Sequence, residues 1–161
     1  MDNAIPITAT DSPTCNLAVQ LVMVRDGQLL LTRRRDTGFA DGDWQAPGGR
    51  IKHDEDVLTG VIRESDEEVG VQLCRENVDM VSAVHIRSPL AGTRIVFTFH
   101  ADTWSGEPYN REPERCSALQ WFDFDDIPGA ILLSTRAAVD LFLRGEHFGV
   151  YGWSQHPSVD G

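Results

Sequence analysis

The segment from Gly48 to Val71 constrains the fold more than any other part of this chain. It begins with a Gly-Gly loop and continues with apolar residues at positions 57, 58, 61 and 62, a spacing that lines one face of an α-helix. Asp54 is predicted to cap the first turn, because a carboxylate accepts the free backbone N–H groups there. Gly70 is predicted to end the helix, because glycine readily adopts the left-handed conformation that follows a helix. The sequence therefore predicts a helix over residues 56–69 with one apolar face to bury.

Segments with the composition of β-strands lie on both sides of this helix. The segments 17–24 and 29–31 are joined by Asp26-Gly27, a dipeptide typical of a tight hairpin turn. Apolar, β-branched and aromatic residues predict further strands over residues 78–86, 94–104 and 118–122.

A second helix is predicted late in the chain, over residues 134–144. Ser134 is expected to open it and Gly145 to close it. Several strands with one internal and one late helix indicate an α/β protein in which helices pack on a mixed β-sheet.

The length of 161 residues predicts one domain. We expect this domain to span residues 15–154, with a loose lead-in over 1–14 and a polar tail over 155–161. The lead-in has neither the basic residues nor the apolar run of a secretory signal, and no apolar run approaches the ~20 residues that cross a bilayer. The three cysteines form no CxxC pair, so reduced, largely buried thiols are expected. These features predict a cytoplasmic protein.

The formal net charge of −11 limits the partners of this chain. A field of this sign repels nucleic-acid polymers and anionic membranes, so neither is expected as a partner. It still allows a small phosphate-bearing substrate, provided that a cation bridges the two negative charges.

Three carboxylates gather near the end of the first predicted helix. Glu64, Glu67 and Glu68 share one face because their spacings are i, i+3 and i+4. Like charges in this arrangement repel one another, and the carboxyl end of a helix disfavours anions. A divalent cation would turn this repulsion into coordination, and oxygen ligands suit Mg²⁺ or Mn²⁺. Arg63 is placed to hold a carboxylate with its guanidinium fork. The alternative is a solvated acidic face.

The whole segment resembles the signature of the Nudix hydrolase family. The pattern consists of Gly49, five residues, Glu55, seven residues, Arg63-Glu64, two residues, Glu67-Glu68, one residue, Gly70 and an apolar Val71. Weaker resemblance extends to the strand and loop before the segment and to Leu119–Phe122 after it. Ser65 departs from the pattern, since the family usually has an apolar residue there. The resemblance implies the Nudix fold, an α/β/α sandwich with a mixed sheet between helices.

The resemblance also implies roles for individual residues. Glu64, Glu67 and Glu68 would carry Mg²⁺, or Mn²⁺ in its place, with the backbone carbonyl of Gly48 as a further ligand. Glu64 or a neighbouring glutamate would act as general base. Glu55 and Arg63 would fix the loop and aim the carboxylates, although an ordinary helix salt bridge is the alternative for them.

Fewer residues outside this segment are candidates for the site. We predict that the substrate contacts Arg33 and Arg35, because arginine forks match phosphate oxygens. Gly49, within the segment, is also predicted to contact the substrate. The alternative for each arginine is an exposed charge at a sheet edge. A loop before the last strand contains Glu112 and Glu114, and Glu114 is favoured as an extra metal ligand. Solvation of both glutamates is the alternative.

The resemblance implies an enzyme that hydrolyses a phosphoanhydride bond by attack of water on phosphorus. The predicted substrate is a nucleoside triphosphate, or another nucleoside diphosphate derivative such as a nucleotide sugar. A catalytically silent nucleotide-sensing module and an isoprenoid diphosphate isomerase are the rivals, and the intact set of glutamates disfavours both. The protein is expected to be a monomer or a homodimer.

Overall fold

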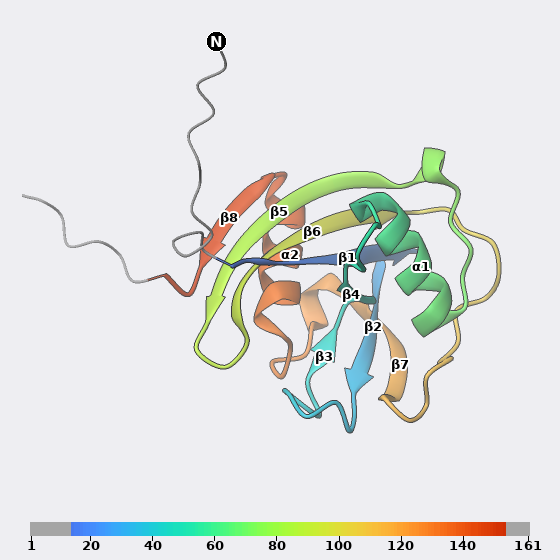
Figure 1. The fold of residues 1–161 in the computed structure, drawn as a ribbon. Helices are drawn as coiled ribbons and strands as arrows, with labels where there is room; N and C mark the ends of the chain where they lie inside the picture. The colour runs from blue at the N-terminus through green and yellow to red at the C-terminus, as the bar shows by residue number, and fades with distance from the viewer. Residues whose placement is uncertain (1–13, 154–161) are drawn as a thin grey trace, which may run out of the picture.

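Strand β1 (Asn16–Arg25) forms the centre of the sheet in the computed structural model, which describes residues 14–153 (Figure 1). It pairs in parallel with β6 (Gly92–Ala101) and antiparallel with β2 (Gln28–Arg34). The turn between β1 and β2 is Asp26-Gly27, and both residues have positive φ, 52° and 77°. Tight hairpin turns require this backbone conformation. The predicted hairpin is confirmed.

The other strands extend the sheet in both directions. Its order is β3-β2-β1-β6-β5-β8, with β4 paired to β1 and β7 paired to β2. The bounds are β3 (Trp44–Gln45), β4 (Gly48–Arg50), β5 (Asp79–Ser88), β7 (Cys116–Asp123) and β8 (Phe148–Tyr151). Because β5 runs antiparallel to β6 and parallel to β8, the sheet is mixed, as predicted.

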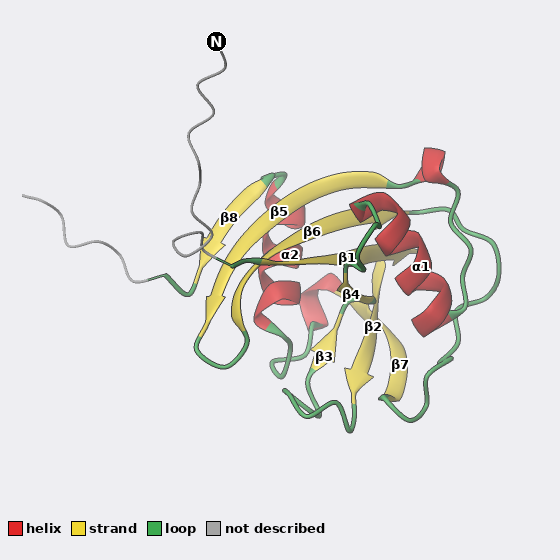
Figure 2. Ribbon diagram, viewed as in Figure 1, coloured by secondary structure: helices red, strands yellow, loops and turns green. Residues whose placement is uncertain are grey.

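Helices α1 (Val57–Val69) and α2 (Leu133–Arg144) cover opposite faces of the sheet (Figure 2). Successive side chains of a strand point to opposite faces, and β1 therefore serves both layers. Leu21 packs in one core with Val61 of α1, whereas Val22 packs in another core with Val139 of α2. The fold is thus the predicted α/β/α sandwich. Within residues 14–153, no helix is long and apolar enough to cross a membrane.

Both helices begin at residues other than those predicted. The cap of α1 is Asp56, whose side chain accepts the N–H groups of Leu58 and Thr59, each at 2.9 Å. Asp54 instead lies in the preceding loop with a φ of 66°. Helix α2 begins before Ser134, and the N-cap Leu132 makes no side-chain hydrogen bond. A polar residue near a helix start is thus not enough to locate the cap. The backbone of the capping residue must also be extended, as it is at Asp56 and not at Asp54.

The expectation of largely buried thiols is wrong for two cysteines. Cys15 and Cys74 are exposed, and only Cys116 is buried. Cys15 lies just before β1, and Cys74 begins a short 3₁₀ helix over Arg75–Asn77; both positions lie outside the packed layers. The lead-in, apart from Thr14, and the tail predicted over 155–161 lie outside the described residues.

Gly48 allows strand β4 to lie directly on β1. A Cβ at Gly48 would overlap the backbone oxygen of Val19 and would come within 2.6 Å of the Cα of Gln20. Both contacts are with backbone atoms of a central strand, which cannot turn aside as a side chain can. Glycine at this position is therefore a requirement of the β1–β4 pairing.

Substitution Gly48→Ala should destabilise the protein, because β4 must move away from β1. We expect the free energy of unfolding to fall by about 1–3 kcal/mol, as for other overpacked sites, and urea denaturation measures it. The matched control is Gly129→Ala, where a Cβ would meet no atom within 4 Å. The control should be neutral or slightly stabilising, since alanine restricts the unfolded chain. Equal stability of the two variants would contradict the packing argument.

Candidate active site

The three carboxylates of helix α1 line one cleft. Glu64, Glu67 and Glu68 share this cleft of about 950 Å³ with residues of β1, β2, β4 and the start of α2. The structure therefore brings together the acidic residues whose helical spacing placed them on one face. The cleft contains the loop glycines Gly48 and Gly49 as well.

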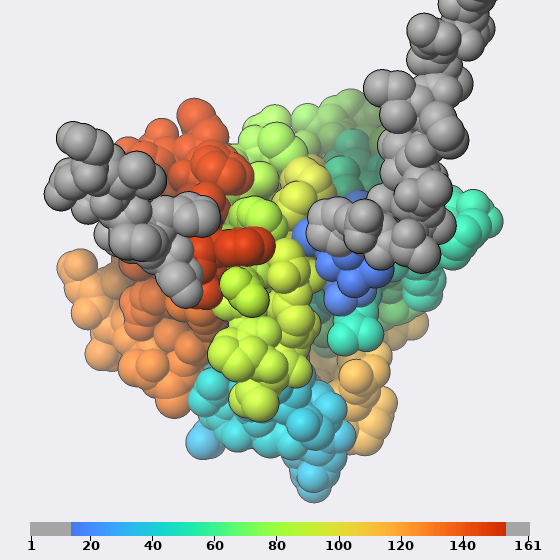
Figure 3. Space-filling model, turned by 60° about the vertical axis from the view of Figure 1, so that its left-hand side comes forward, coloured from blue at the N-terminus to red at the C-terminus, as the bar shows by residue number. Residues whose placement is uncertain are grey.

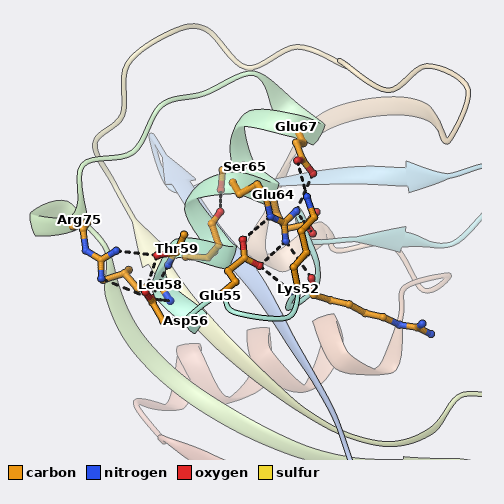
Figure 4. A network of polar contacts seen from close by, with 12 residues as sticks. Lys52, Glu55, Asp56, Leu58, Thr59, Glu64, Ser65, Glu67 and Arg75 are labelled. Carbon is orange, nitrogen blue, oxygen red and sulfur yellow. Dashed lines mark hydrogen bonds and ion pairs between the residues drawn. The ribbon is translucent and has the colours of Figure 1, made fainter.

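Arg63 forms ion pairs with three acidic side chains, Glu55, Glu64 and Glu67, which Figure 4 labels. Its Nε atom donates to Glu55 Oε1 at 2.7 Å. Its Nη1 atom donates to Glu64 Oε1 at 2.7 Å and to Glu67 Oε2 at 2.9 Å. The side chain of Arg63 is only 18% exposed, so water screens these ion pairs weakly. Arg63 thus holds the helix carboxylates and the preceding loop in one network.

The network lowers the pKa of Glu55 strongly. The hydrogen bond from Arg63 is the main cause, and the N–H of Lys52 adds a second donor at 3.0 Å, so that the pKa of Glu55 falls to about 2. The same pairing with Glu55 raises the pKa of Arg63. Glu55 therefore remains a carboxylate bound to Arg63 at any physiological pH.

Glu68 differs from Glu64 and Glu67, because the hydrogen bond that its side chain accepts comes from a backbone N–H and not from Arg63. The N–H of Gly48 donates to Glu68 Oε2 at 2.9 Å. Burial raises the pKa of Glu68 to about 8, and repulsion from Glu64 and Glu112 acts in the same direction. Burial also raises the pKa of Glu64, against the effect of Arg63. For Glu64 and Glu68, the positive charge nearby is thus too small to offset the effect of burial on the pKa.

The loop between β6 and β7 contributes Glu112 rather than Glu114. Glu112 lines the cleft, whereas Glu114 is exposed and does not line it. The loop is fixed to the end of α1 by Arg111, whose N–H donates to the Glu68 carbonyl at 3.1 Å and whose Nη1 donates to Asp66 Oδ1 at 2.7 Å. The structure thus favours Glu112 as the glutamate nearer the carboxylates, whereas a metal-binding role for Glu114 stays a prediction. Nothing in the sequence alone distinguishes the two glutamates.

The predicted substrate arginines are only partly placed at the cleft. Arg33 lines it, with Nε donating to the Gly42 carbonyl at 2.9 Å. Arg35 does not line it and pairs with Asp36 instead, since β2 ends at Arg34 and the chain turns away. Arg34 lines the cleft but is used to hold the loop, through Gln45, Thr37 and the Phe39 carbonyl. Three further arginines that no sequence motif indicated line the cleft, namely Arg50, Arg94 and Arg115.

Gly49 makes room for a carboxylate. A Cβ at Gly49 would lie 2.5 Å from Glu64 Oε1, so only glycine lets the Glu64 carboxylate lie against this loop. The structure thus gives Gly49 a steric reason to be glycine, whereas its predicted contact with substrate remains a prediction.

The donor set of the cleft fits a hard divalent cation. Its candidate ligands are carboxylate and carbonyl oxygens, which Mg²⁺ and Mn²⁺ prefer. In the part of the chain that the structure describes, no basic side chain forms an ion pair with Glu68. Among residues 14–153, however, no three His, Cys, Asp or Glu side chains are grouped so as to hold a metal ion. Glu64 and Glu67 instead contact Arg63. The oxygen atoms that could bind a metal ion are therefore present, but those of Glu64 and Glu67 are engaged in ion pairs with Arg63.

Comparison with known proteins identifies the family. The NUDIX domain model matches residues 16–142. The uncharacterized Nudix hydrolase YvcI of Bacillus subtilis is 32% identical over 108 residues, which are 66% of this chain and 65% of that protein. The oxidized purine nucleoside triphosphate hydrolase of Mus musculus is 34% identical over 116 residues, 70% of this chain and 69% of that protein.

A solved structure agrees with this result. The crystal structure of a MutT NUDIX hydrolase from Burkholderia pseudomallei matches with a TM-score of 0.73 and 33% identity, covering 80% of this chain and 98% of that one. The chain therefore belongs to the Nudix hydrolase family, whose members act on nucleoside diphosphate derivatives. The family and fold expected from the Gly48–Val71 segment are confirmed.

Substitution Glu55→Gln should destabilise the protein in a pH-dependent way. Loss of the charged hydrogen bonds to Arg63 should lower the free energy of unfolding at pH 7 by about 1.5–3 kcal/mol. Because folding depresses the pKa of Glu55 from 4.5 to about 2, its contribution is complete above pH ~4.5 and is lost as the pH falls toward 2. Urea denaturation at pH 7, 5 and 3.5 measures the difference between wild type and variant.

The control for this experiment is Glu76→Gln, which removes the same charge from an exposed residue of the 3₁₀ helix. It should change stability by less than about 0.5 kcal/mol. A wild-type advantage over Glu55→Gln that stays constant from pH 7 to 3.5 would refute the ion pair as its source.

Proposed function

We propose that this protein hydrolyses a phosphoanhydride bond of a nucleoside triphosphate with the help of Mg²⁺, for which Mn²⁺ can substitute. Another nucleoside diphosphate derivative, such as a nucleotide sugar, is the second candidate substrate. The similarity to a hydrolase of oxidized purine nucleoside triphosphates supports the first choice. A cytoplasmic location, and a monomeric or homodimeric state, remain predictions.

The charge distribution of the cleft carries this proposal. The chain has a net charge of −11, yet seven of its 14 lysines and arginines line this one cleft, against four glutamates. The basic residues are Arg33, Arg34, Arg50, Lys52, Arg63, Arg94 and Arg115, and the acidic ones are Glu64, Glu67, Glu68 and Glu112. A cleft that is locally cationic in a strongly anionic protein focuses a polyanion such as a polyphosphate. The adjacent carboxylates are the feature that a simple anion-binding site lacks.

Each group in the cleft then has a chemical task. A divalent cation, when bound, supplies charge neutralisation of the phosphate oxygens and a more acidic water. Glu64, Glu67 and Glu68 would hold it, with Gly48 and Glu112 as further oxygen donors. A glutamate of this set, Glu64 or a neighbour, would accept the proton of the attacking water. Glu55 holds the Arg63 guanidinium in place and so fixes the preceding loop relative to helix α1.

A catalytically silent sensing function fits the cleft less well. A silent sensing module needs no carboxylates near the phosphates, yet α1 keeps all three of them at the cleft. Burying such groups costs free energy unless a ligand compensates them. The cost favours an enzyme over a passive binding module.

A nucleotide panel tests the proposed function. We expect phosphate or pyrophosphate release from nucleoside triphosphates, including oxidized purines, in Mg²⁺ and none in EDTA. Substitution Glu68→Gln should lower kcat by roughly two to three orders of magnitude, since several kcal/mol of charge stabilisation depend on this group. Nucleotide sugars and nucleoside diphosphates in the same panel separate the two substrate classes.

The matched control is Asp140→Asn, which removes one negative charge from α2 at a position that does not line the cleft. Its kcat should equal that of the wild type. Circular dichroism checks that both variants fold. Full activity of Glu68→Gln, or hydrolysis that persists in EDTA, would overturn the proposal.

A further inference from the structure

Arg94 is a partly buried arginine for which the structure shows no acidic partner. It lies on β6 and lines both the main cleft and a smaller side pocket of about 70 Å³. Its Nη2 atom donates to the Ala91 carbonyl at 3.1 Å. Within the described part of the chain, neither Arg94 nor its neighbour Arg50 forms an ion pair with a carboxylate. Lone charged groups of this kind are expensive to desolvate, so a ligand that compensates them would bind favourably.

The groups that face Arg94 are themselves cationic. Burial lowers the pKa of Arg94, and repulsion from Arg50 and Arg34 lowers it further. Strand pairing accounts for this proximity. Arg94 lies opposite Asn16 of β1, and Arg50 of β4 lies opposite Ala18 of the same strand. The fold therefore places these arginines on β4 and β6, the two strands that flank the start of β1.

Arg50 connects this pair to the carboxylates. Its backbone carbonyl accepts a hydrogen bond from Arg63 Nη2 at 3.2 Å, while its side chain belongs to the group around Arg94. The preceding residue is Gly49, which lies against Glu64. The glutamates, Arg50 and Arg94 therefore line one continuous cleft.

The side pocket beside Arg94 is mainly apolar. Phe39, Ala91 and Leu132 contribute to its walls. Ala91 and Phe39 come from two segments that are in contact in Figure 3, the turn between β5 and β6, in yellow-green, and the loop before β3, in cyan. Arg94 is therefore a cationic group set among apolar walls, where an ion pair with a ligand would be weakly screened.

We propose that Arg94, together with Arg50, binds a phosphate group of the substrate other than the phosphate that is attacked. The assignment rests on the proposed function, and it restricts the substrate to molecules with such an additional phosphate. This group is either the next phosphate of a triphosphate chain or a phosphate on the far side of a diphosphate derivative. The planar guanidinium matches phosphate oxygens with two parallel hydrogen bonds, which an ammonium group cannot reproduce.

Variants of Arg94 test the assignment through KM. For the substrate class that uses the subsite, Arg94→Gln should raise KM about 10- to 100-fold and leave kcat nearly unchanged, as expected for loss of a charged hydrogen bond. Arg94→Lys should be intermediate. The control is Arg87→Gln on β5, an exposed arginine that stacks on Trp153 outside the cleft and should change nothing.

The choice of substrates separates the two sources of the phosphate. A nucleoside triphosphate is compared with the diphosphate of the same nucleoside, and a dinucleotide with a ribose phosphate is compared with the same dinucleotide without it. An effect of Arg94→Gln confined to the triphosphate identifies the phosphate chain, and one confined to the phosphorylated dinucleotide identifies the distal phosphate. A uniform change of KM over all four substrates, or none, would refute the subsite.

A binding measurement keeps this proposal separate from the proposed function. Inorganic triphosphate in EDTA should raise the melting temperature of the wild type and of Glu68→Gln, because ligands stabilise the state that they bind. Arg94→Gln should lose this increase. If no nucleotide is hydrolysed but the increase depends on Arg94, the hydrolase proposal fails and the anion subsite stands. Equal increases in wild type and Arg94→Gln, or no increase in the wild type, would overturn the subsite.

Discussion

The guanidinium of Arg63 makes it possible for helix α1 to carry its acidic face. Glu64 and Glu67 lie in the half of the helix where the dipole disfavours negative charge, and they lie close to each other. Arg63 contacts both of them and also Glu55 of the preceding loop, with N···O distances of 2.7 to 2.9 Å. One cation thus pairs with three carboxylates, of which Glu55 and Glu64 are largely buried and Glu67 is partly exposed. The loop, the helix and the cleft all take their positions from this network.

The same network explains how a cation could enter without disrupting the fold. Glu64 and Glu67 share one nitrogen of Arg63, whereas Glu55 accepts from Nε and Nη2, at 2.7 and 2.9 Å. If Glu64 and Glu67 turned to a metal ion, Glu55 would still hold the guanidinium. Lys52, which reaches Glu67 at 3.3 Å, is exposed and is released at little cost. Glu55 is therefore the permanent partner in the network, which suits its strongly depressed pKa.

Local sequence patterns predicted the helices and turns whose formation depends on residues that are close together in the chain. The helical periodicity of 56–69, the Asp26-Gly27 turn and the helix-ending Gly70 all follow from near neighbours in the chain, and all are observed. The spacing of the three glutamates likewise decides which face of α1 they share.

What the sequence could not show depends on contacts between distant segments. Strands β3, β4 and β8 have two to four residues each and exist only because another strand pairs with them. The choice between Glu112 and Glu114 depends on how Arg111 binds to α1, and the position of Arg94 depends on the pairing of β6 with β1. Gly60, an unfavourable residue inside a helix, is explained by Ile51, whose Cδ1 would lie 2.5 Å from a Cβ there. Ser65, the departure from the family pattern, is buried and satisfies its hydroxyl by donating to the Val61 carbonyl at 2.6 Å.

The pairing of β4 with β1 couples the stability of the sheet to the chemistry of the cleft. Gly48 pairs with Gln20, and its own N–H holds Glu68. A shift of β4 by even a fraction of a hydrogen-bond length would therefore move or release the most buried carboxyl of the cleft. Arg50, two residues further along β4, would shift with it relative to Arg94 on the other side of β1. The central strand thus sets the distance between the carboxylates and the arginine pair.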